Sequence, residues 1–166
     1  MAIKDSLLPE FDHEMGATRR VLERVPVADL AWKPHDKSFT LGQLAAHVAN
    51  IPHWIEMTLG HEMLDLATLG DDARPKQPTA LEPILIAFDE NVKKGRAKLD
   101  GQSDPEMLSP WTLKNGAQTF FTMPKAAVWR TFIMNHIIHH RGQLTVYLRL
   151  RNVPLPALYG PTADEG

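Results

Sequence analysis

Four segments of the chain repeat apolar residues at alternating intervals of three and four positions, and this repeat limits the fold more than any other feature. Such spacing places apolar side chains along one face of an α-helix. The first segment shows it most simply, with Leu8, Phe11, Met15, Thr18, Leu22 and Val25. Four amphipathic helices in 166 residues predict an all-α fold, a four-helix bundle that forms one domain over residues 1–166.

Proline and capping residues mark the ends of the first two predicted helices. Pro26 ends the first helix, and we expect residues 26–39 to form a connection. Thr40 and Gln43 have the spacing of a capping box, in which two side chains bond the free amides at a helix start. Pro52 then lacks the amide that would continue the hydrogen-bond ladder. The second helix is therefore predicted to kink at this proline.

The middle of the chain is predicted to be a loop followed by a third helix. Residues 60–78 combine glycine, aspartate and proline, which predicts a loop with room for a short helical turn. Thr79 and Glu82 repeat the capping-box spacing, so we expect the next helix to begin there and to run to about Leu99. Pro83 falls in the first turn of that helix, where proline is best tolerated.

A small β-hairpin is predicted before the last helix. Asn115 and Gly116 form a two-residue turn signal, and the segments 111–113 and 118–121 beside them suit short strands. The last helix is expected to cover residues 124–152. The proline-containing tail that follows should lie extended over the body of the protein.

Composition excludes several kinds of function. The net charge of −2 provides no basic footprint for nucleic acid, and no apolar run reaches membrane-spanning length. The chain contains no cysteine, so disulfides, thiolate metal sites and cysteine nucleophiles are absent. Residues 1–6 lack the apolar core of a signal peptide, and we expect a cytoplasmic protein. Any metal must be held by nitrogen and oxygen ligands.

A pair of histidines near the chain's end is the main candidate for chemistry. His136 and His140 are four residues apart, so on a helix their imidazoles point the same way and can reach one metal ion. His47 interrupts the apolar stripe of the second helix and is a candidate third ligand. Three such ligands inside a bundle leave open coordination positions. We place the pair on an inward stripe with Trp129, Ile133, Leu144 and Tyr147, whose apolar face is widened by Phe132, Ile137 and Leu148.

Each of these histidines could instead be a core residue that bonds a carbonyl or a carboxylate. His139 could also replace His140 as a ligand, but its direction from the helix axis favours His140. Gln143 and Asn50 each follow a candidate ligand by three residues, and either could orient a ligand or remain a polar surface residue.

No general acid or base is evident beside the histidines. Asp12 and Glu14 on the first helix are candidates only. The four tryptophans are expected to pack in the core rather than to stack on a ligand.

Several stretches resemble the DinB/YfiT-like family over nearly the whole chain. The C-terminal stretch is the more specific, and the tryptophan–proline block upstream is the weaker. The similar stretches are Trp32–Pro34, Ser38–Thr40, Leu44–His47, Asn135–Leu144, Leu148–Arg149, Val153–Pro154 and Leu158–Glu165.

The resemblance implies an up-down-down-up four-helix bundle that forms a homodimer. It also implies one divalent metal held by three histidines, which at the matching positions are His47, His136 and His140. All three positions are histidine here. Characterised relatives include thiol-dependent S-transferases, isomerases that use a low-molecular-weight thiol, and metal-dependent hydrolases.

Three hypotheses about function follow. Three imidazoles would accept zinc, nickel or iron. The metal could activate water for hydrolysis. It could instead activate the thiol of a low-molecular-weight cofactor for transfer to a small-molecule substrate. Alternatively, the bundle is a dimer that binds a metal or small ligand without turnover, as a sensor or stress-related protein. No motif in the chain selects the substrate.

Overall fold

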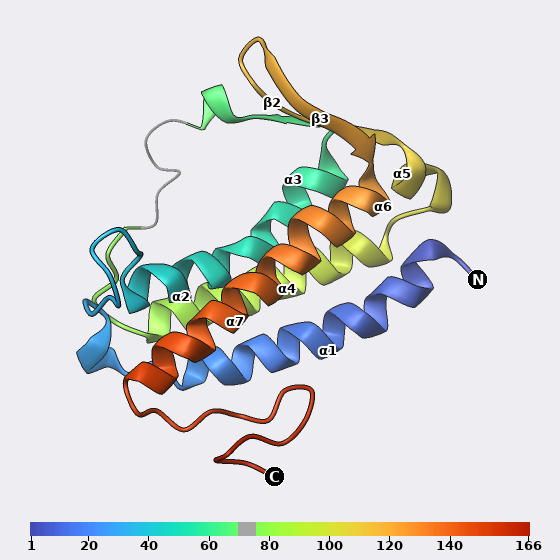
Figure 1. Cartoon of the computed structure of the whole chain (residues 1–166). Helices are drawn as coiled ribbons and strands as arrows, with labels where there is room; N and C mark the ends of the chain where they lie inside the picture. Colours follow the sequence, from blue (N-terminus) through green and yellow to red (C-terminus); the bar gives the residue numbers. More distant parts are fainter. Residues whose placement is uncertain (70–75) are drawn as a thin grey trace.

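Long helical segments pack side by side in the computed structural model, which describes residues 1–69 and 76–166 (Figure 1). Most of the described chain is helical, as predicted, and a small sheet lies at one end. The long segments are α1 (Ile3–Glu23), α2 (Leu41–Asn50) with α3 (Trp54–Gly60), α4 (Glu82–Asp100), and α6 (Lys125–Val128) with α7 (Asn135–Leu150). Helix α1 packs on α4 and α7, and α2 packs on the same two helices. None of the described helices has the length and apolarity that crossing a membrane requires.

The second helix begins and breaks as predicted. The Thr40 hydroxyl accepts the Gln43 amide at 3.1 Å, and the Gln43 side chain accepts the Thr40 amide at 3.0 Å. This reciprocal pair satisfies free amides at the start of α2. Helix α2 ends at Asn50, and the 3₁₀ turn η2 (Ile51–His53) separates it from α3. Pro52 lies in that turn, which confirms the expected interruption.

The last helix extends over the predicted range but contains an irregular turn. The π-helical turn η5 (Trp129–Met134) joins α6 to α7, and a π turn changes the direction of the side chains that follow it. Asn152 adopts a left-handed φ of 57°, and the Val153 amide donates to the Leu148 carbonyl at 3.0 Å. Such a residue and bond end many helices.

The face of α7 that points into the core differs from the predicted stripe. Its buried residues are Ile137, Arg141, Leu144 and Leu148. Ile137, Leu144 and Leu148 are on the predicted apolar face, whereas His136, His140 and Tyr147 of the predicted stripe are only partly buried, so the buried face is rotated towards Ile137 and Leu148. The buried face also includes Arg141, which is 1% exposed and whose charge is paired with that of Glu14 on α1. The two histidines therefore lie at the edge of the core, where a ligand can approach them.

The third long helix begins differently from the prediction. Helix α4 starts at Glu82, and its capping position is Leu81, whose side chain makes no cap bond. The expected capping box from Thr79 to Glu82 is therefore wrong. Pro83 does lie in the first turn of α4, as predicted. A capping box occurs instead at Ser103 and Glu106, which begin a short helix α5 (Asp104–Leu108).

The sheet contains the predicted hairpin and one further strand. Strands β2 (Pro110–Asn115) and β3 (Gln118–Pro124) are antiparallel, and β1 (Met63–Asp65) pairs with β2 in parallel. Asn115 pairs with Gln118, so the turn residues are Gly116 and Ala117 rather than the predicted Asn115 and Gly116. Gly116 has a φ of 58°, which glycine adopts without strain.

The predicted loop over residues 60–78 is only partly a loop. It contains strand β1 and a helical turn, η3 (Leu66–Thr68), which matches the short turn expected there. Residues 70–75 of this predicted loop lie outside the described residues. Strand β1 escaped prediction because three residues are too few for a strand pattern to be visible.

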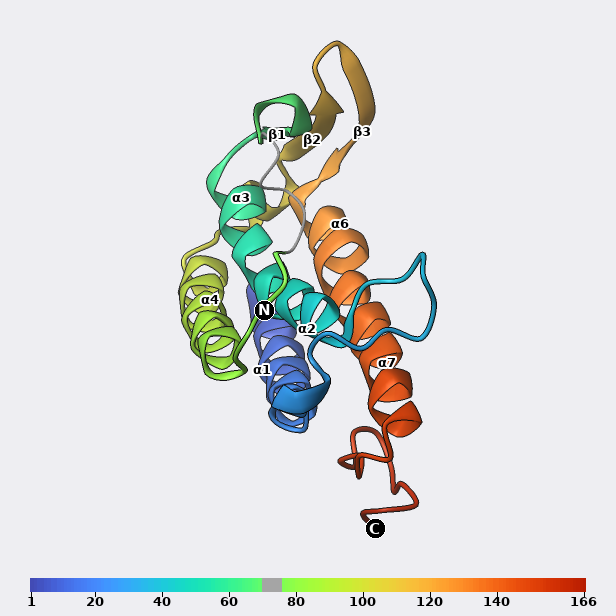
Figure 2. The same ribbon diagram turned by 90° about the vertical axis from the view of Figure 1, so that its left-hand side faces the viewer.

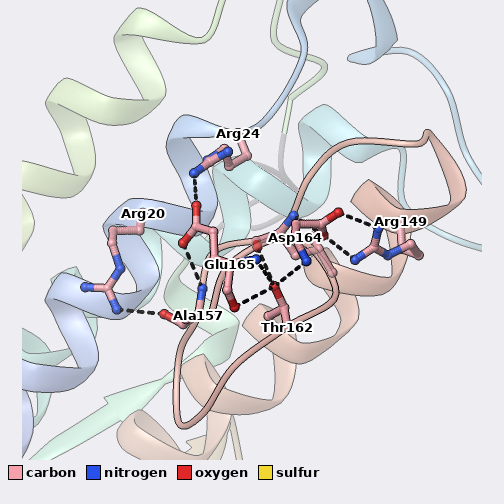
Figure 3. Close-up of polar contacts among 8 residues, drawn as sticks. Arg20, Arg24, Arg149, Ala157, Thr162, Asp164 and Glu165 are labelled. Carbon is pink, nitrogen blue, oxygen red and sulfur yellow. Dashed lines mark hydrogen bonds and ion pairs between the residues drawn. The ribbon is translucent and has the colours of Figure 1, made fainter.

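The C-terminal tail packs on the helices but is not simply extended (Figure 3). It folds back, because Asp164 accepts the Leu155 amide at 2.9 Å and Glu165 accepts the Ala157 amide at 3.1 Å. The same two carboxylates pair with Arg149 of α7 and Arg24 after α1, respectively. The tail thus joins α1 to α7 at the end of the molecule away from the sheet.

Candidate metal centre

Three imidazole rings converge between α2 and α7, which run alongside each other in Figure 2. His47 comes from the last turn of α2, and His136 and His140 come from the first two turns of α7. The Nε2 atoms of His47 and His136 are 3.2 Å apart. The ring centre of His140 lies 4.6 Å from that of His47 and 4.7 Å from that of His136. One ligand atom from each ring lies within 4.8 Å of the others.

Two of the rings have partners in the last helical segment. The Nδ1–H of His140 donates to the Gln143 side-chain oxygen at 2.7 Å, which leaves Nε2 of His140 without its proton. The backbone of Phe132, one turn earlier in η5, acts on the His136 ring and opposes the lowering of its pKa by burial. Ring orientation through the second nitrogen is typical of metal-binding histidines. Gln143 thus makes the orienting contact that its spacing suggested.

The three rings are held in their neutral form. Burial lowers the pKa of His47 to about 4, and electrostatic repulsion from His140 and His136 adds to this shift. Burial likewise lowers the pKa of His136 to about 4, with the neighbouring His140 as the next cause. The pKa of His140 is lowered mainly by burial, although the bond to Gln143 opposes the shift. Neutral imidazole is the form that binds a metal ion.

The spacing of the rings fits a shared divalent ion. Two nitrogens bound at about 2.0–2.1 Å to one tetrahedral ion are roughly 3.3 Å apart, and the two Nε2 atoms here are 3.2 Å apart. Three nitrogen donors with no thiolate suit zinc, nickel and iron. Of the described aspartate and glutamate residues, none joins the three histidines to make a larger cluster of this spacing.

The other residues singled out in the sequence lie elsewhere or only nearby. His139 is exposed, and its ring lies edge-on to His140 at 4.9 Å rather than bonding another helix. Asn50 is exposed at the end of α2. Asp12 pairs with Arg96 at 2.8 Å, and Glu14 pairs with Arg141 at 2.7 Å. Both carboxylates are thus engaged by arginines, which argues against either as the general base.

Two aromatic residues beside the cluster were missed in the sequence. The Trp54 ring centre lies 5.6 Å from that of His136, and the Phe132 ring centre lies 6.0 Å from it. Trp54 is only partly buried, so its assignment to the core was incomplete. Phe132 could have been found, because it precedes His136 by four residues and such residues share a helix face.

The metal-free protein is expected to lose stability as the pH falls from about 6.5 towards 4. In the unfolded chain His47 and His136 take up protons near the ordinary pKa of 6.5, whereas in the folded protein they do so near 4. Between these values the unfolded state binds more protons, so the free energy of unfolding falls with falling pH. Urea unfolding at several pH values would measure it. The double variant His47→Gln/His136→Gln should show a flatter profile; an unchanged slope would contradict the assignment.

The fold and the cluster together define a class: a mainly helical protein in which three histidines from two helices converge on one point. A sequence model described as the DinB family matches residues 1–166, so the chain belongs to the DinB family. The uncharacterized protein YrdA of Bacillus subtilis (strain 168) is 25% identical over 161 residues, which cover 97% of this chain and 90% of that protein.

Two solved structures share the fold. A DinB-like protein from Bacillus cereus ATCC 10987 aligns with a TM-score of 0.72 and 22% identity, over 95% of this chain and 98% of that one. YjoA, a DinB-like protein from Bacillus subtilis, aligns with a TM-score of 0.69 and 18% identity, over 95% of this chain and 99% of that one. At these identities the likeness supports the fold alone.

Proposed function

We propose that this protein is a metal-dependent S-transferase in which His47, His136 and His140 hold one divalent ion. The observation that carries the proposal is the convergence of three neutral imidazoles, with two Nε2 atoms 3.2 Å apart. A divalent ion held by three neutral ligands keeps its double positive charge, and it lowers the pKa of a thiol or water that reaches it. The co-substrate in this proposal is a low-molecular-weight thiol.

Thiol transfer is favoured over hydrolysis by the surroundings of the cluster. A hydrolase needs a nearby acid or base to move protons to the leaving group. The described carboxylates do not join the cluster, and Asp12 and Glu14 are paired with arginines. A thiolate that attacks an electrophilic carbon forms a carbon–sulfur bond while the leaving group departs with its electron pair. That exchange needs no protein base once the thiol has lost its proton.

The chain's own residues would prepare this site in three ways. Burial keeps the imidazoles neutral, as their lowered pKa values require. Gln143 fixes which nitrogen of His140 carries the proton. Placement of the rings on two packed helices fixes their separation before the ion arrives, so little conformational entropy is lost on binding.

Elemental analysis of protein purified without an affinity tag measures how much metal each chain binds. Assays with thiol conjugation partners and with activated esters establish which reaction, if either, the protein catalyses. Metal at one ion per chain with thiol-dependent turnover is the expected result. Turnover of esters without a thiol would instead establish a hydrolase. Bound metal without turnover in either assay would support the non-catalytic sensor or structural role. Protein that contains no metal and takes none up would overturn the proposal.

Removing the Gln143 amide is expected to weaken metal binding about 10- to 100-fold, the usual effect of losing a residue that orients a ligand. Gln143→Leu takes away the acceptor of the His140 Nδ1–H bond, whereas Gln143→Glu keeps one. Competition with a chelator would measure the affinities. Asn50→Ala is the matched control, since Asn50 is exposed and three residues from His47. Equal loss in the control and in Gln143→Leu would contradict the orienting role.

The proposal includes the up-down-down-up arrangement and a homodimer that the family resemblance implies. In Figure 1, α1 and α7 run one way and α2, α3 and α4 run the other, which supports this order. Two large apolar side chains on α7, Val146 and Leu150, are 58% and 55% exposed, which would suit a contact between copies. Sedimentation equilibrium would establish the number of copies.

A further inference from the structure

Aromatic rings lie against one side of the histidine cluster. The Trp54 ring lies edge-on to His136, at 5.6 Å between centres and 78° between planes. The Phe132 ring lies 5.1 Å from Trp54 and 6.0 Å from His136. Phe121 of β3 extends this group, with its ring centre 6.0 Å from that of Phe132. We refer to this group, which consists of Trp54, Phe132 and Phe121, as the aromatic wall.

The aromatic wall packs partly against the core, through Phe121 and Phe132, but it is incompletely buried. Trp111 and Trp129 are fully buried, as the core of this protein requires. Trp54, Phe132 and Phe121 are each partly exposed, although they pack against one another. Each of these residues therefore keeps some surface open to solvent, and Trp54 and Phe132 lie beside the half-buried His136. Burying such surface against a flat apolar group is favourable.

A further aromatic side chain lies beside His47. Phe39, in the connection before α2, has its ring centre 6.0 Å from that of His47 and is 39% exposed. The polar neighbours of the cluster, Gln143 and His139, belong to the later turns of α7. A ligand bound at the three histidines would therefore lie near aromatic rings at His136 and His47 and near the polar side chain of Gln143 at His140.

The chemistry of the cluster determines what the other end of such a ligand must be. Three neutral ligands leave a divalent ion with its full charge and with open coordination positions, so an anionic donor of the substrate is favoured there beside the thiolate of the co-substrate. We propose that the site binds small molecules that combine an anionic donor atom with an aromatic ring, the donor at the three histidines and the ring against Trp54 and Phe132. This inference rests on the metal site proposed above and adds the class of its substrate.

Two hydroxamates that differ only in their apolar part test the inference on zinc-loaded protein. Acetohydroxamate and benzohydroxamate present the same anionic donor pair, and only the second carries a ring. We expect benzohydroxamate to bind on the order of tenfold more tightly, since aromatic contacts add to the burial of ring area. Calorimetry would measure both dissociation constants.

Three variants locate the ring of the ligand. Trp54→Leu and Phe132→Leu should each remove most of the preference for benzohydroxamate and leave acetohydroxamate binding unchanged. Two separate variants are used so that misfolding of one does not decide the result. Phe120→Leu is the matched control, because Phe120 is 48% exposed on the same hairpin as Phe121. This control should keep the full preference.

The outcomes separate this inference from the proposed metal site. Zinc content per chain is measured first for each protein. If wild-type protein takes up no zinc, the proposed metal site is contradicted, and so is the aromatic subsite that depends on it. If zinc binds but the two hydroxamates bind equally, or if Phe120→Leu loses the preference as fully as Trp54→Leu, only the aromatic subsite is overturned.

Discussion

Substitution of His47 or His140 by alanine is expected to weaken metal binding on the order of 100- to 1,000-fold. Structural zinc sites with four ligands bind with about 10–16 kcal/mol, so one ligand accounts for roughly a quarter of that free energy, and each 1.4 kcal/mol is tenfold. The rings of these two residues meet at 4.6 Å between centres and come from different helices. Each substitution therefore removes the contribution of one side of the site. Chelator competition on each variant would measure the loss.

The matched control for this experiment is His139→Ala. His139 is next to His140 in the chain, but it is exposed and its ring lies outside the cluster. His139 acts on the site only through its charge, which lowers the pKa of both His136 and His140. Removing His139 therefore changes the electrostatics of the site but takes away no ligand. Metal affinity should change by less than about threefold. A loss in His139→Ala as large as that in His140→Ala would move the second ligand of α7 to position 139.

The pairing of His136 with His140 and the limits of α2 around His47 follow from short-range rules, whereas the convergence of His47 with the pair was implied by the family resemblance and depends on the packing of α2 on α7. A spacing of four residues on a helix depends only on helix geometry. Thr40 and Gln43 define where α2 starts, and their reciprocal bonds occur as expected. Pro52 then breaks the helix one turn beyond His47. These signals are local, so they do not depend on contacts between distant segments.

The rotation of α7 could not be predicted in the same way. An arginine in a sequence pattern indicates the solvent side of a helix, and Arg141 was not placed on the buried stripe. In the structure its guanidinium pairs with Glu14, and the Tyr159 hydroxyl bonds the same carboxylate at 2.8 Å. Glu14 is 127 residues away along the chain. A buried charge whose partner is that distant leaves no periodic signal.

Elements that depend on pairing rather than on pattern were also missed. Strand β1 has three residues and exists because β2 offers it a free edge. At the start of α4, Thr79 and Glu82 have the correct residue types, but the helix begins at Glu82 with Leu81 in the capping position. The residue types at 79 and 82 therefore predicted a capping box, but the box cannot form because the helix begins three residues after Thr79.

Arg141→Met is expected to reduce the free energy of unfolding by about 3–5 kcal/mol, the cost of leaving one member of a buried ion pair without its partner. The side chains of Arg141 and Glu14 are only 2% and 8% exposed. Arg141 also donates to the Glu14 carbonyl at 3.1 Å and to the Tyr159 hydroxyl of the tail. Removing it leaves the carboxylate of Glu14, on α1, buried without its charged partner. Urea unfolding of the metal-free protein would measure the loss.

Two further variants decide whether burial is the cause of that loss. Arg130→Met breaks the pair with Glu10, whose members are 50% and 36% exposed, and should cost less than about 1 kcal/mol. The double variant Glu14→Leu/Arg141→Met removes both buried charges and should recover at least half of the loss, because apolar side chains of similar size often replace a buried pair without cost. If the double variant is as unstable as Arg141→Met, the unpaired carboxylate is not the reason. Lost bonds from Arg141 to α1 and to the tail would then account for the whole effect.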